Sequence, residues 1–276
     1  MPTKLGQNFL RDEKVLKKII DSANLSTDDL VIEIGPGGGL LTEALAKKCK
    51  KIVAIEIDGS LCTLLRNRFS NKKNVEIINA NILKIDLRQL ISNFQIPISN
   101  KIPGSKFQIP NFPYKVIANL PYYITSPIIR LFLESEFPPQ EMILMVQKEV
   151  AERIIAKPGQ MSVLAVSVQY YAAAELLFAV SKNSFFPVPE VDSAVIRITR
   201  NPEPVARSSE EVKKFFRVVR AVFSAKRKTL VNNLSSSFHL NKKEVEEKIK
   251  KIGLNPKVRA QELSVEEWKK LTKLFG

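Results

Sequence analysis

The segment from Glu33 to Gly39, with the sequence EIGPGGG, joins an apolar run to a helical pattern and has the residue types of a ligand-binding turn. Glycines let the backbone turn tightly and let a ligand approach the first turn of the following helix. Glu56 ends the next apolar run, 21 residues beyond Gly35. An acidic side chain there can accept hydrogen bonds from both hydroxyls of a ribose. This pattern favours a nucleoside-containing cofactor over a merely structural turn.

The spacing of the glycines also bears on which cofactor binds. A dinucleotide fingerprint has the form G-x-G-x-x-G. Counted from Gly35 and Gly37, the third glycine position holds Leu40, which argues against a cradled pyrophosphate and a nicotinamide-dependent oxidoreductase. A cofactor that has adenosine but no phosphate fits better, and we expect S-adenosylmethionine.

The segment Asn119-Leu120-Pro121-Tyr122 follows a later apolar run, at the sheet edge where open α/β sheets bind ligands. Methylation of a base amine requires that amine to attack a methyl on sulfur, although its lone pair is delocalised into the ring. Hydrogen bonds from the amine to the Asn119 side-chain oxygen and to a nearby main-chain carbonyl would return electron density to the nitrogen. Pro121 stiffens the loop and has no competing N–H, and Tyr122 offers a stacking face. The alternative is a strand-to-turn junction with a packing tyrosine.

The composition argues against several other chemistries. Two cysteines, Cys49 and Cys62, and one histidine, His239, argue against a His/Cys metal centre and a hydrolase with a histidine base, so we expect no metal. The 276 residues include 43 Lys and Arg against 28 Asp and Glu, a net charge of +15 that predicts a polyanionic partner, nucleic acid or anionic lipid. The sequence indicates neither a secretory signal nor a membrane span, and nothing demands a dimer. We therefore expect a cytoplasmic monomer that does not bind membranes.

Short apolar runs alternate with helical patterns over the first 200 residues. The alternation predicts βαβ units and a parallel sheet with helices on both faces, and the uniformly apolar runs suit strands covered on both sides. The predicted strands are 30–34, 51–57, 75–78, 115–118 and 141–146.

The rest of the chain predicts two domains, residues 1–200 and 201–276, joined by a proline-containing linker at 200–209. Residues 92–114 contain four prolines and predict a long surface loop. Residues 161–180 are better interpreted as a buried helix followed by a strand than as a membrane span. Beyond the linker the patterns are only helical, and Ser264 with Glu267 predicts a capping box that opens the last helix.

Together these motifs resemble the ribosomal RNA adenine N6,N6-dimethyltransferases over nearly the whole chain. The matching segments are 4–10 (KLGQNFL), 33–39 (EIGPGGG), 56–58 (EID), 119–122 (NLPY), 185–193 (FFPVPEVDS) and 221–230 (AVFSAKRKTL). Leu120 and the chain length resemble the type that dimethylates two adjacent adenosines near the 3′ end of small-subunit RNA. The large-subunit, macrolide-resistance type more often has Ile in place of Leu120. The resemblance implies an α/β, Rossmann-like S-adenosylmethionine-dependent methyltransferase domain followed by a small all-helical, RNA-binding domain.

The resemblance also implies a role for individual residues. Asn8 and Leu10 would close over the cofactor, Asn119 would bridge cofactor and target amine, and the adenine would lie between Tyr122 and Phe185. Either Phe185 or its neighbour Phe186 would do no more than pack in the core. The implied cofactor-binding set is Gln7, Asn8, Leu10, Gly35, Gly37, Glu56, Ile57, Asn81, Ile82 and Asn119, and the implied catalytic set is Asn119, Leu120, Pro121, Tyr122 and Phe185.

Asn81 is a departure from the family pattern, which usually has aspartate at this position. Aspartate would accept a hydrogen bond from the adenine amine of the cofactor. Asn81 can accept through its amide oxygen but carries no charge, so we expect weaker cofactor binding.

The basic excess is concentrated in the tail, where residues 200–276 carry 19 basic and 9 acidic side chains. Lys226, Arg227 and Lys228 follow an apolar helical pattern and predict contacts to RNA phosphates, whereas Lys248–Lys251 lie among glutamates and indicate a solvated helix face. The expected partner is ribosomal RNA in the small subunit or its precursor. A non-catalytic RNA-binding assembly factor and a large-subunit methyltransferase remain as alternatives.

Overall fold

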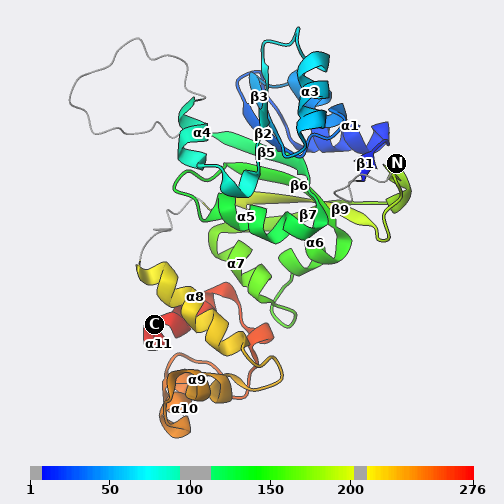
Figure 1. Cartoon of the computed structure of the whole chain (residues 1–276). Helices are drawn as coiled ribbons and strands as arrows, with labels where there is room; N and C mark the ends of the chain where they lie inside the picture. Colours follow the sequence, from blue (N-terminus) through cyan, green and yellow to red (C-terminus); the bar gives the residue numbers. More distant parts are fainter. Residues whose placement is uncertain (1–7, 94–112, 202–209) are drawn as a thin grey trace, which may run out of the picture. The chain divides into compact units, whose positions relative to one another are not determined.

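The computed structural model describes residues 8–93, 113–201 and 210–276, and its chain divides into two compact units (Figure 1). The first unit comprises the described residues up to Lys148 together with Glu175–Arg200, and the second comprises Glu149–Ala174 together with the described residues from Asn201 onward. Two consecutive domains were predicted, with one boundary after residue 200. Residues 149–174 instead group with the C-terminal helices because the rings of Tyr170 and Tyr171 pack against Phe215 and Phe216.

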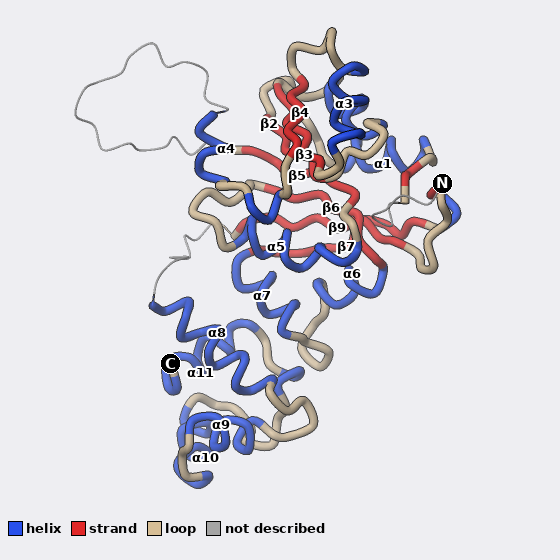
Figure 2. The backbone as a smooth tube through the Cα atoms, in the orientation of Figure 1, coloured by secondary structure: helices blue, strands red, loops and turns tan. Residues whose placement is uncertain are grey.

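A seven-stranded sheet forms the centre of the first unit (Figure 2). Its order is β4-β3-β2-β5-β6-β9-β7, in which β2 to β6 are parallel and β9 runs antiparallel to β6. The strands are β2 (Leu30–Ile34), β3 (Lys51–Glu56), β4 (Val75–Asn79), β5 (Tyr114–Asn119), β6 (Glu141–Gln147), β7 (Ala172–Val180) and β9 (Ser193–Arg200). All five strands predicted before residue 150 are present, and the helix and strand predicted within 161–180 are α7 (Val163–Tyr171) and β7.

Helices and short 3-10 turns connect these strands. They are α1 (Glu13–Ser22), α2 (Leu40–Ala46), α3 (Gly59–Arg68), η1 (Ile82–Lys84), α4 (Leu87–Asn93), η2 (Tyr122–Ile124), α5 (Thr125–Leu133) and η3 (Lys182–Ser184). One core forms where Ile19 of α1 and Leu41 and Leu45 of α2 pack with strand residues such as Val31 and Ile117. Apolar side chains at this spacing on α1 and α2 place both helices on one face of the sheet. The carboxyl ends of the parallel strands remain free for a ligand.

A separate two-stranded ribbon joins the two ends of the first unit. β1 (Phe9–Leu10) pairs antiparallel with β8 (Phe185–Phe186), so that Phe9 lies opposite Phe186 and Leu10 opposite Phe185. The pairing brings the start of the described chain to a segment that is remote in sequence.

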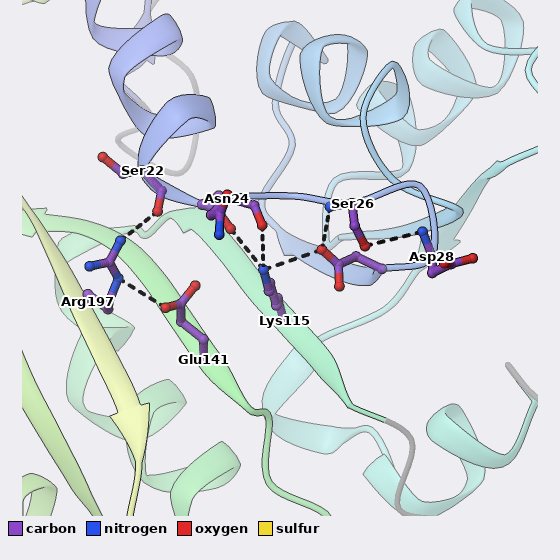
Figure 3. Close-up of polar contacts among 9 residues, drawn as sticks. Ser22, Asn24, Ser26, Asp28, Lys115, Glu141 and Arg197 are labelled. Atoms are coloured by element: carbon purple, nitrogen blue, oxygen red, sulfur yellow. Dashed lines mark hydrogen bonds and ion pairs between the residues drawn. The ribbon is translucent and has the colours of Figure 1, made fainter.

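Two basic side chains of the sheet hold the carboxyl end of α1 (Figure 3). Lys115 of β5 donates to the carbonyls of Ala23 and Asn24 at 2.9 and 3.0 Å, and Arg197 of β9 donates to the Ser22 carbonyl at 2.6 Å. The last turn of α1 has no basic residue of its own. The sheet therefore supplies the positive charge that a helix carboxyl end favours.

Acidic partners complete this network on both sides. Lys115 forms an ion pair with Asp29 at 3.3 Å, while Arg197 pairs with Glu141 at 3.0 Å and Glu175 at 2.8 Å. Burial raises the pKa of Glu141, and the Arg197 guanidinium opposes that shift. The network anchors α1, whose other end adjoins the ribbon.

The second unit is helical apart from the first residues of β7. Its helices are most of α6 (Lys148–Ile154), α7, α8 (Glu210–Phe223), α9 (Leu230–Phe238), α10 (Lys242–Lys251), η4 (Ala260–Glu262) and α11 (Val265–Phe275). The predicted capping box opens α11, since Ser264 Oγ accepts from Glu267 N and the Glu267 side chain accepts from Ser264 N. The rings of Phe223 and Trp268 stack between α8 and α11 at 5.4 Å.

Most of the predicted loop at 92–114 and of the predicted linker at 200–209 lies outside the described residues. Residues 92–93 end α4, Tyr114 opens β5, and Arg200 ends β9. None of the helices within the described part of the chain is both long and apolar enough to span a lipid bilayer.

Candidate cofactor and base-binding site

A cavity of about 460 Å³ opens at the carboxyl ends of β2, β3 and β5 in the first unit. That volume lies in the range of small-molecule sites. All described members of the predicted cofactor and catalytic sets line it, namely Asn8, Leu10, Gly35, Gly37, Glu56, Ile57, Asn81, Ile82, Asn119, Leu120, Pro121, Tyr122 and Phe185. Gln7 lies outside the described residues. The motifs identified from the sequence therefore meet in one site.

The glycine turn forms one wall, and its backbone requires glycine. Gly35 and Gly37 have φ angles of +66° and +54°, in the left-handed region that side chains disfavour. A Cβ at Gly37 would also lie 2.8 Å from the ring of Phe9. Gly35 donates its N–H to the Ile55 carbonyl of the neighbouring strand at 2.9 Å, which holds the turn beside β3.

Glu56 ends β3 with its carboxylate already positioned. The side chain is 2% exposed. One carboxylate oxygen accepts from Gly37 N at 3.3 Å and the other from Asp58 N at 3.0 Å. Each oxygen keeps a further lone pair, so the carboxylate is oriented in advance to accept two hydroxyl groups.

Glu33 also lines the cavity, and the sequence analysis assigned no role to its side chain. It is 1% exposed, and its Oε2 atom has no hydrogen-bond partner in the described chain. Burial raises its pKa to about 8, and the Glu56 carboxylate contributes to the increase. A buried carboxyl oxygen without a partner in a cavity indicates a missing donor or cation. The sequence contained a signal for a role of Glu33 in the site, because this acid lies near the end of a strand and before the first glycine of the turn.

Asn81 follows β4 and caps η1. Its Oδ1 atom accepts from Leu83 N at 3.0 Å, which fixes the orientation of the amide. No partner of its Nδ2 group is present among the described residues. Asn81 was expected to accept a hydrogen bond from the cofactor through its oxygen. That oxygen accepts one bond in the cap and keeps a second lone pair, so Asn81 can offer a ligand an oriented acceptor as well as the Nδ2 donor.

Asn119 has the opposite arrangement at the end of β5. Its Nδ2 group donates to the main-chain carbonyl of Asn8 at 3.4 Å, which leaves Oδ1 as an acceptor. Leu120 N donates to Met145 O at 3.0 Å, and the Pro121 carbonyl accepts from Ile124 N at 3.2 Å. Within the described chain, no donor is hydrogen-bonded to the Leu120 carbonyl. The loop thus keeps a side-chain and a main-chain acceptor uncommitted.

The aromatic residues around the cavity differ in how they are held. The hydroxyl groups of Tyr122 and Ser193, at the start of β9, are hydrogen-bonded at 3.0 Å, so the Tyr122 ring is fixed and half-buried. Phe185 is 4% exposed and belongs to the core, yet it also lines the cavity. Its neighbour Phe186 is 54% exposed.

The predicted phosphate contacts lie on an exposed turn of the second unit. Lys226, Arg227 and Lys228 connect α8 to α9, and in the described chain none of them forms an ion pair. The buried Asn233 holds this turn, since its Nδ2 group donates to the carbonyls of Val222 and Ala225 at 2.7 and 3.0 Å. By contrast, Lys248 and Lys250 pair with glutamates on α10, as expected for a solvated helix face.

The residues present fit S-adenosylmethionine. Glu33 lines the cavity and has one buried carboxyl oxygen without a partner among the described residues, which suits an ammonium group. Glu56 offers its paired acceptors for a ribose, and at Gly35 and Gly37 the cavity is lined by backbone alone. Over residues 8–93, 113–201 and 210–276, no three His, Cys, Asp or Glu side chains gather as metal ligands.

Comparison with known proteins decides the family. The family model described as ribosomal RNA adenine dimethylase matches residues 1–276. The chain belongs to this family. It is similar to ribosomal RNA small subunit methyltransferase A of Geobacillus thermodenitrificans (strain NG80-2), with 43% identity over 274 residues that cover 97% of this chain and 88% of the relative. The chain is therefore an rRNA adenine dimethyltransferase, and S-adenosylmethionine is its methyl donor.

Solved structures agree with this assignment. The crystal structure of the 23S rRNA methyltransferase ErmE is similar with a TM-score of 0.72 and 27% identity, covering 97% of this chain and 99% of that chain. A dimethyladenosine transferase from Plasmodium falciparum has a TM-score of 0.74 at 24% identity, with 95% of each chain covered, and supports the fold. The predicted fold class, a Rossmann-like methyltransferase domain followed by helices, is confirmed.

Proposed function

We propose that this chain dimethylates N6 of two adjacent adenosines near the 3′ end of small-subunit ribosomal RNA. The observation that carries the catalytic part is the Asn119 loop. Asn119 Nδ2 is committed to the Asn8 carbonyl, so Asn119 Oδ1 and the Leu120 carbonyl are the acceptors left at the wall of the cofactor cavity. The choice of the small subunit is supported by relatives such as the Geobacillus thermodenitrificans protein named above.

The proposed mechanism places the two N–H groups of the adenine amine on these two acceptors. When these two acceptors receive both hydrogen bonds, electron density shifts onto the amine nitrogen. The lone pair of that nitrogen then turns toward the cofactor side of the cavity. Bound S-adenosylmethionine supplies an electrophilic methyl group. The amine becomes acidic once methylated, so no side chain has to act as a strong base. For the second transfer, one N–H remains for one of the acceptors.

Tyr122 and Phe185 position the base in this proposal. The bond between Tyr122 and Ser193 fixes the Tyr122 ring before the adenine arrives. Removing a base from its stack costs a few kcal/mol, and stacking on an aromatic ring contributes about 1–3 kcal/mol per base. Phe185 contributes from the core side, where its packing holds the cavity wall. Lys226, Arg227 and Lys228 would hold RNA phosphates from the second unit.

The test is a methyl-transfer assay on unmethylated small ribosomal subunits. The purified chain and S-adenosylmethionine are incubated with the subunits, the RNA is digested, and modified nucleosides are identified by mass spectrometry. N6,N6-dimethyladenosine at two adjacent positions near the 3′ end is the expected product. The absence of product on small-subunit RNA would overturn the proposal.

Large-subunit RNA is the second candidate substrate. The similarity to the 23S rRNA methyltransferase ErmE, at 27% identity over nearly the whole chain, is the observation that favours it. The same assay on unmethylated large subunits separates the two candidates. A product on large-subunit RNA alone would establish the second candidate.

A further inference from the structure

An exposed aromatic ring covered on one side by a guanidinium lies next to the cavity. The Cζ atom of Arg11 is 4.1 Å from the centroid of the Phe186 ring, at cation–π distance. More than half of Phe186 is exposed, although the preceding residue, Phe185, is buried. Phe186 therefore leaves part of an aromatic ring open to solvent beside a ligand site.

Phe186 is exposed but not loosely held. The β1 and β8 ribbon pairs Phe186 with Phe9, and Arg11 N donates to the Ser184 carbonyl at 2.9 Å. The hydroxyl of Ser184 donates to Asp12 Oδ2 at 3.0 Å, which ties the segment to the cap of α1. Several bonds from remote parts of the sequence thus present this ring in one place.

The pair lies at the rim of the cavity. Arg11 itself lines the cavity, as does Phe185, the neighbour of Phe186. In an RNA strand that places one base in the cavity, the adjacent base lies close to the cavity rim. A guanidinium plane and an aromatic face are the surfaces on which proteins stack unpaired RNA bases. The positive charge of Arg11 also suits the phosphate between the two nucleotides.

We propose that Phe186 and Arg11 form a stacking platform for the base next to the adenosine being methylated. The platform rests on the proposed function, because it requires an RNA strand with its target base in the cavity. It would hold the neighbouring nucleotide while the target base is in place, and would therefore act on RNA binding and not on the cofactor.

The direct test is fluorescence of 2-aminopurine, whose emission falls when it stacks. A short single-stranded RNA with one target adenosine carries 2-aminopurine on its 5′ side, and a second RNA carries it on the 3′ side. The wild-type chain with S-adenosylhomocysteine is expected to quench one of the two probes. Phe186→Leu, which keeps apolar bulk but has no ring, should lose the quenching, and Phe186→Trp should restore it. Equal quenching by wild type and Phe186→Leu would overturn the platform.

Kinetics on unmethylated small subunits give the second readout. Phe186→Leu is expected to raise KM for the subunits about tenfold, with kcat and the Kd for S-adenosylmethionine nearly unchanged. Val188→Ala is the matched control, because Val188 is an apolar residue without a ring, 55% exposed two residues further along the chain. Arg11→Gln should weaken RNA binding and reduce its salt dependence by about one unit.

The failure of the platform is distinguishable from failure of the proposed function. If wild type forms no dimethyladenosine on small subunits, the proposed function fails whatever the variants do. If wild type is active and Phe186→Leu has an unchanged KM, only the platform is overturned. If Phe186→Leu binds assembled subunits more weakly than wild type but binds protein-free RNA equally well, the surface contacts a ribosomal protein. That result would overturn the platform as well.

Discussion

Glu33 and Glu56 stand on the neighbouring parallel strands β2 and β3 and line the same cavity, but their carboxyl oxygens differ in hydrogen bonding. Glu56 accepts from two main-chain N–H groups, whereas Glu33 Oε2 is buried without a partner among the described residues. Burial therefore raises the pKa of Glu33 to about 8, and the Glu56 charge adds to it. The two acids are suited to different parts of one ligand: Glu56 to hydroxyl groups and Glu33 to a cation.

The substitution Glu33→Gln tests these different roles of the two acids by the number of protons that cofactor binding releases. At pH 7 most of wild-type Glu33 is protonated, since its pKa is about 8. An ammonium group bound beside it favours the carboxylate, so cofactor binding near pH 7 should release close to one proton. Calorimetry in two buffers with different ionisation enthalpies measures that release. Glu33→Gln should release almost none, and an equal release by both proteins would contradict the assignment.

The same residue makes stability depend on pH. Between about pH 4.5 and pH 8, unfolded Glu33 loses its proton while the folded residue keeps it. The unfolded state then binds fewer protons, so the free energy of unfolding falls as pH rises through this window and levels off above it. Urea denaturation at several pH values should show a shallower decline for Glu33→Gln than for wild type.

Asn81→Asp should strengthen cofactor binding. One carboxylate oxygen can replace Oδ1 as the acceptor from Leu83 N, and the second would accept from the adenine amine with the negative charge that the Asn81 amide lacks. A charge-assisted hydrogen bond in place of a neutral one should lower the Kd for S-adenosylhomocysteine by about tenfold. Titration calorimetry checks this, with Asn67→Asp, at an exposed position of α3 outside the cavity lining, as the control. A weaker or unchanged Kd for Asn81→Asp would contradict the expected gain from the charge.

Asn119→Ala should reduce kcat for methyl transfer by about 100-fold or more, the size of effect seen when one preorganised polar group is removed from a reacting centre. The fold should survive, because among the described residues the Asn119 side chain forms one long hydrogen bond, to the Asn8 carbonyl. Thermal denaturation and single-turnover kinetics separate the two effects. An Asn119→Ala protein with full kcat would end the proposed role of its side-chain oxygen.

Neutralising Lys226, Arg227 and Lys228 to glutamine should weaken RNA binding and lower its salt dependence by about two units. The matched control neutralises Lys248, Lys250 and Lys251, of which Lys248 and Lys250 are engaged with glutamates on α10. Fluorescence anisotropy of a labelled RNA at several salt concentrations measures both slopes. If the two triple variants have equal slopes, Lys226, Arg227 and Lys228 belong to a solvated surface and do not contact phosphates.

Lys115→Met should lower the free energy of unfolding by about 1–3 kcal/mol, because it leaves the Ala23 and Asn24 carbonyls at the end of α1 without their donor. Lys47→Met removes an exposed pair with Glu43 and should cost about 0.5 kcal/mol or less. Urea denaturation compares the two. A similar small loss for both would mean that Lys115 does not anchor α1.

Local sequence patterns predicted the parts of the fold that depend on near neighbours. The five apolar runs are strands because residues of a parallel sheet are covered on both faces, and Ser264 with Glu267 forms the predicted cap because both partners lie within one turn. The glycine turn, Glu56, Asn81 and the Asn119 loop lie at the ends of parallel strands of that sheet. Their meeting in one cavity follows from the rule that parallel strands end at the same edge.

Tertiary structure decided the contacts between remote residues. The antiparallel pairing of β9 with β6, the placement of Arg11 on Phe186, and the grouping of residues 149–174 with the last helices all depend on partners more than 20 residues away. Long-range packing also decides that Asn119 keeps a free acceptor and that Glu33 Oε2 has no partner among the described residues. A sequence shows which groups a side chain carries, but which of them are left for a ligand depends on the long-range packing that consumes the others.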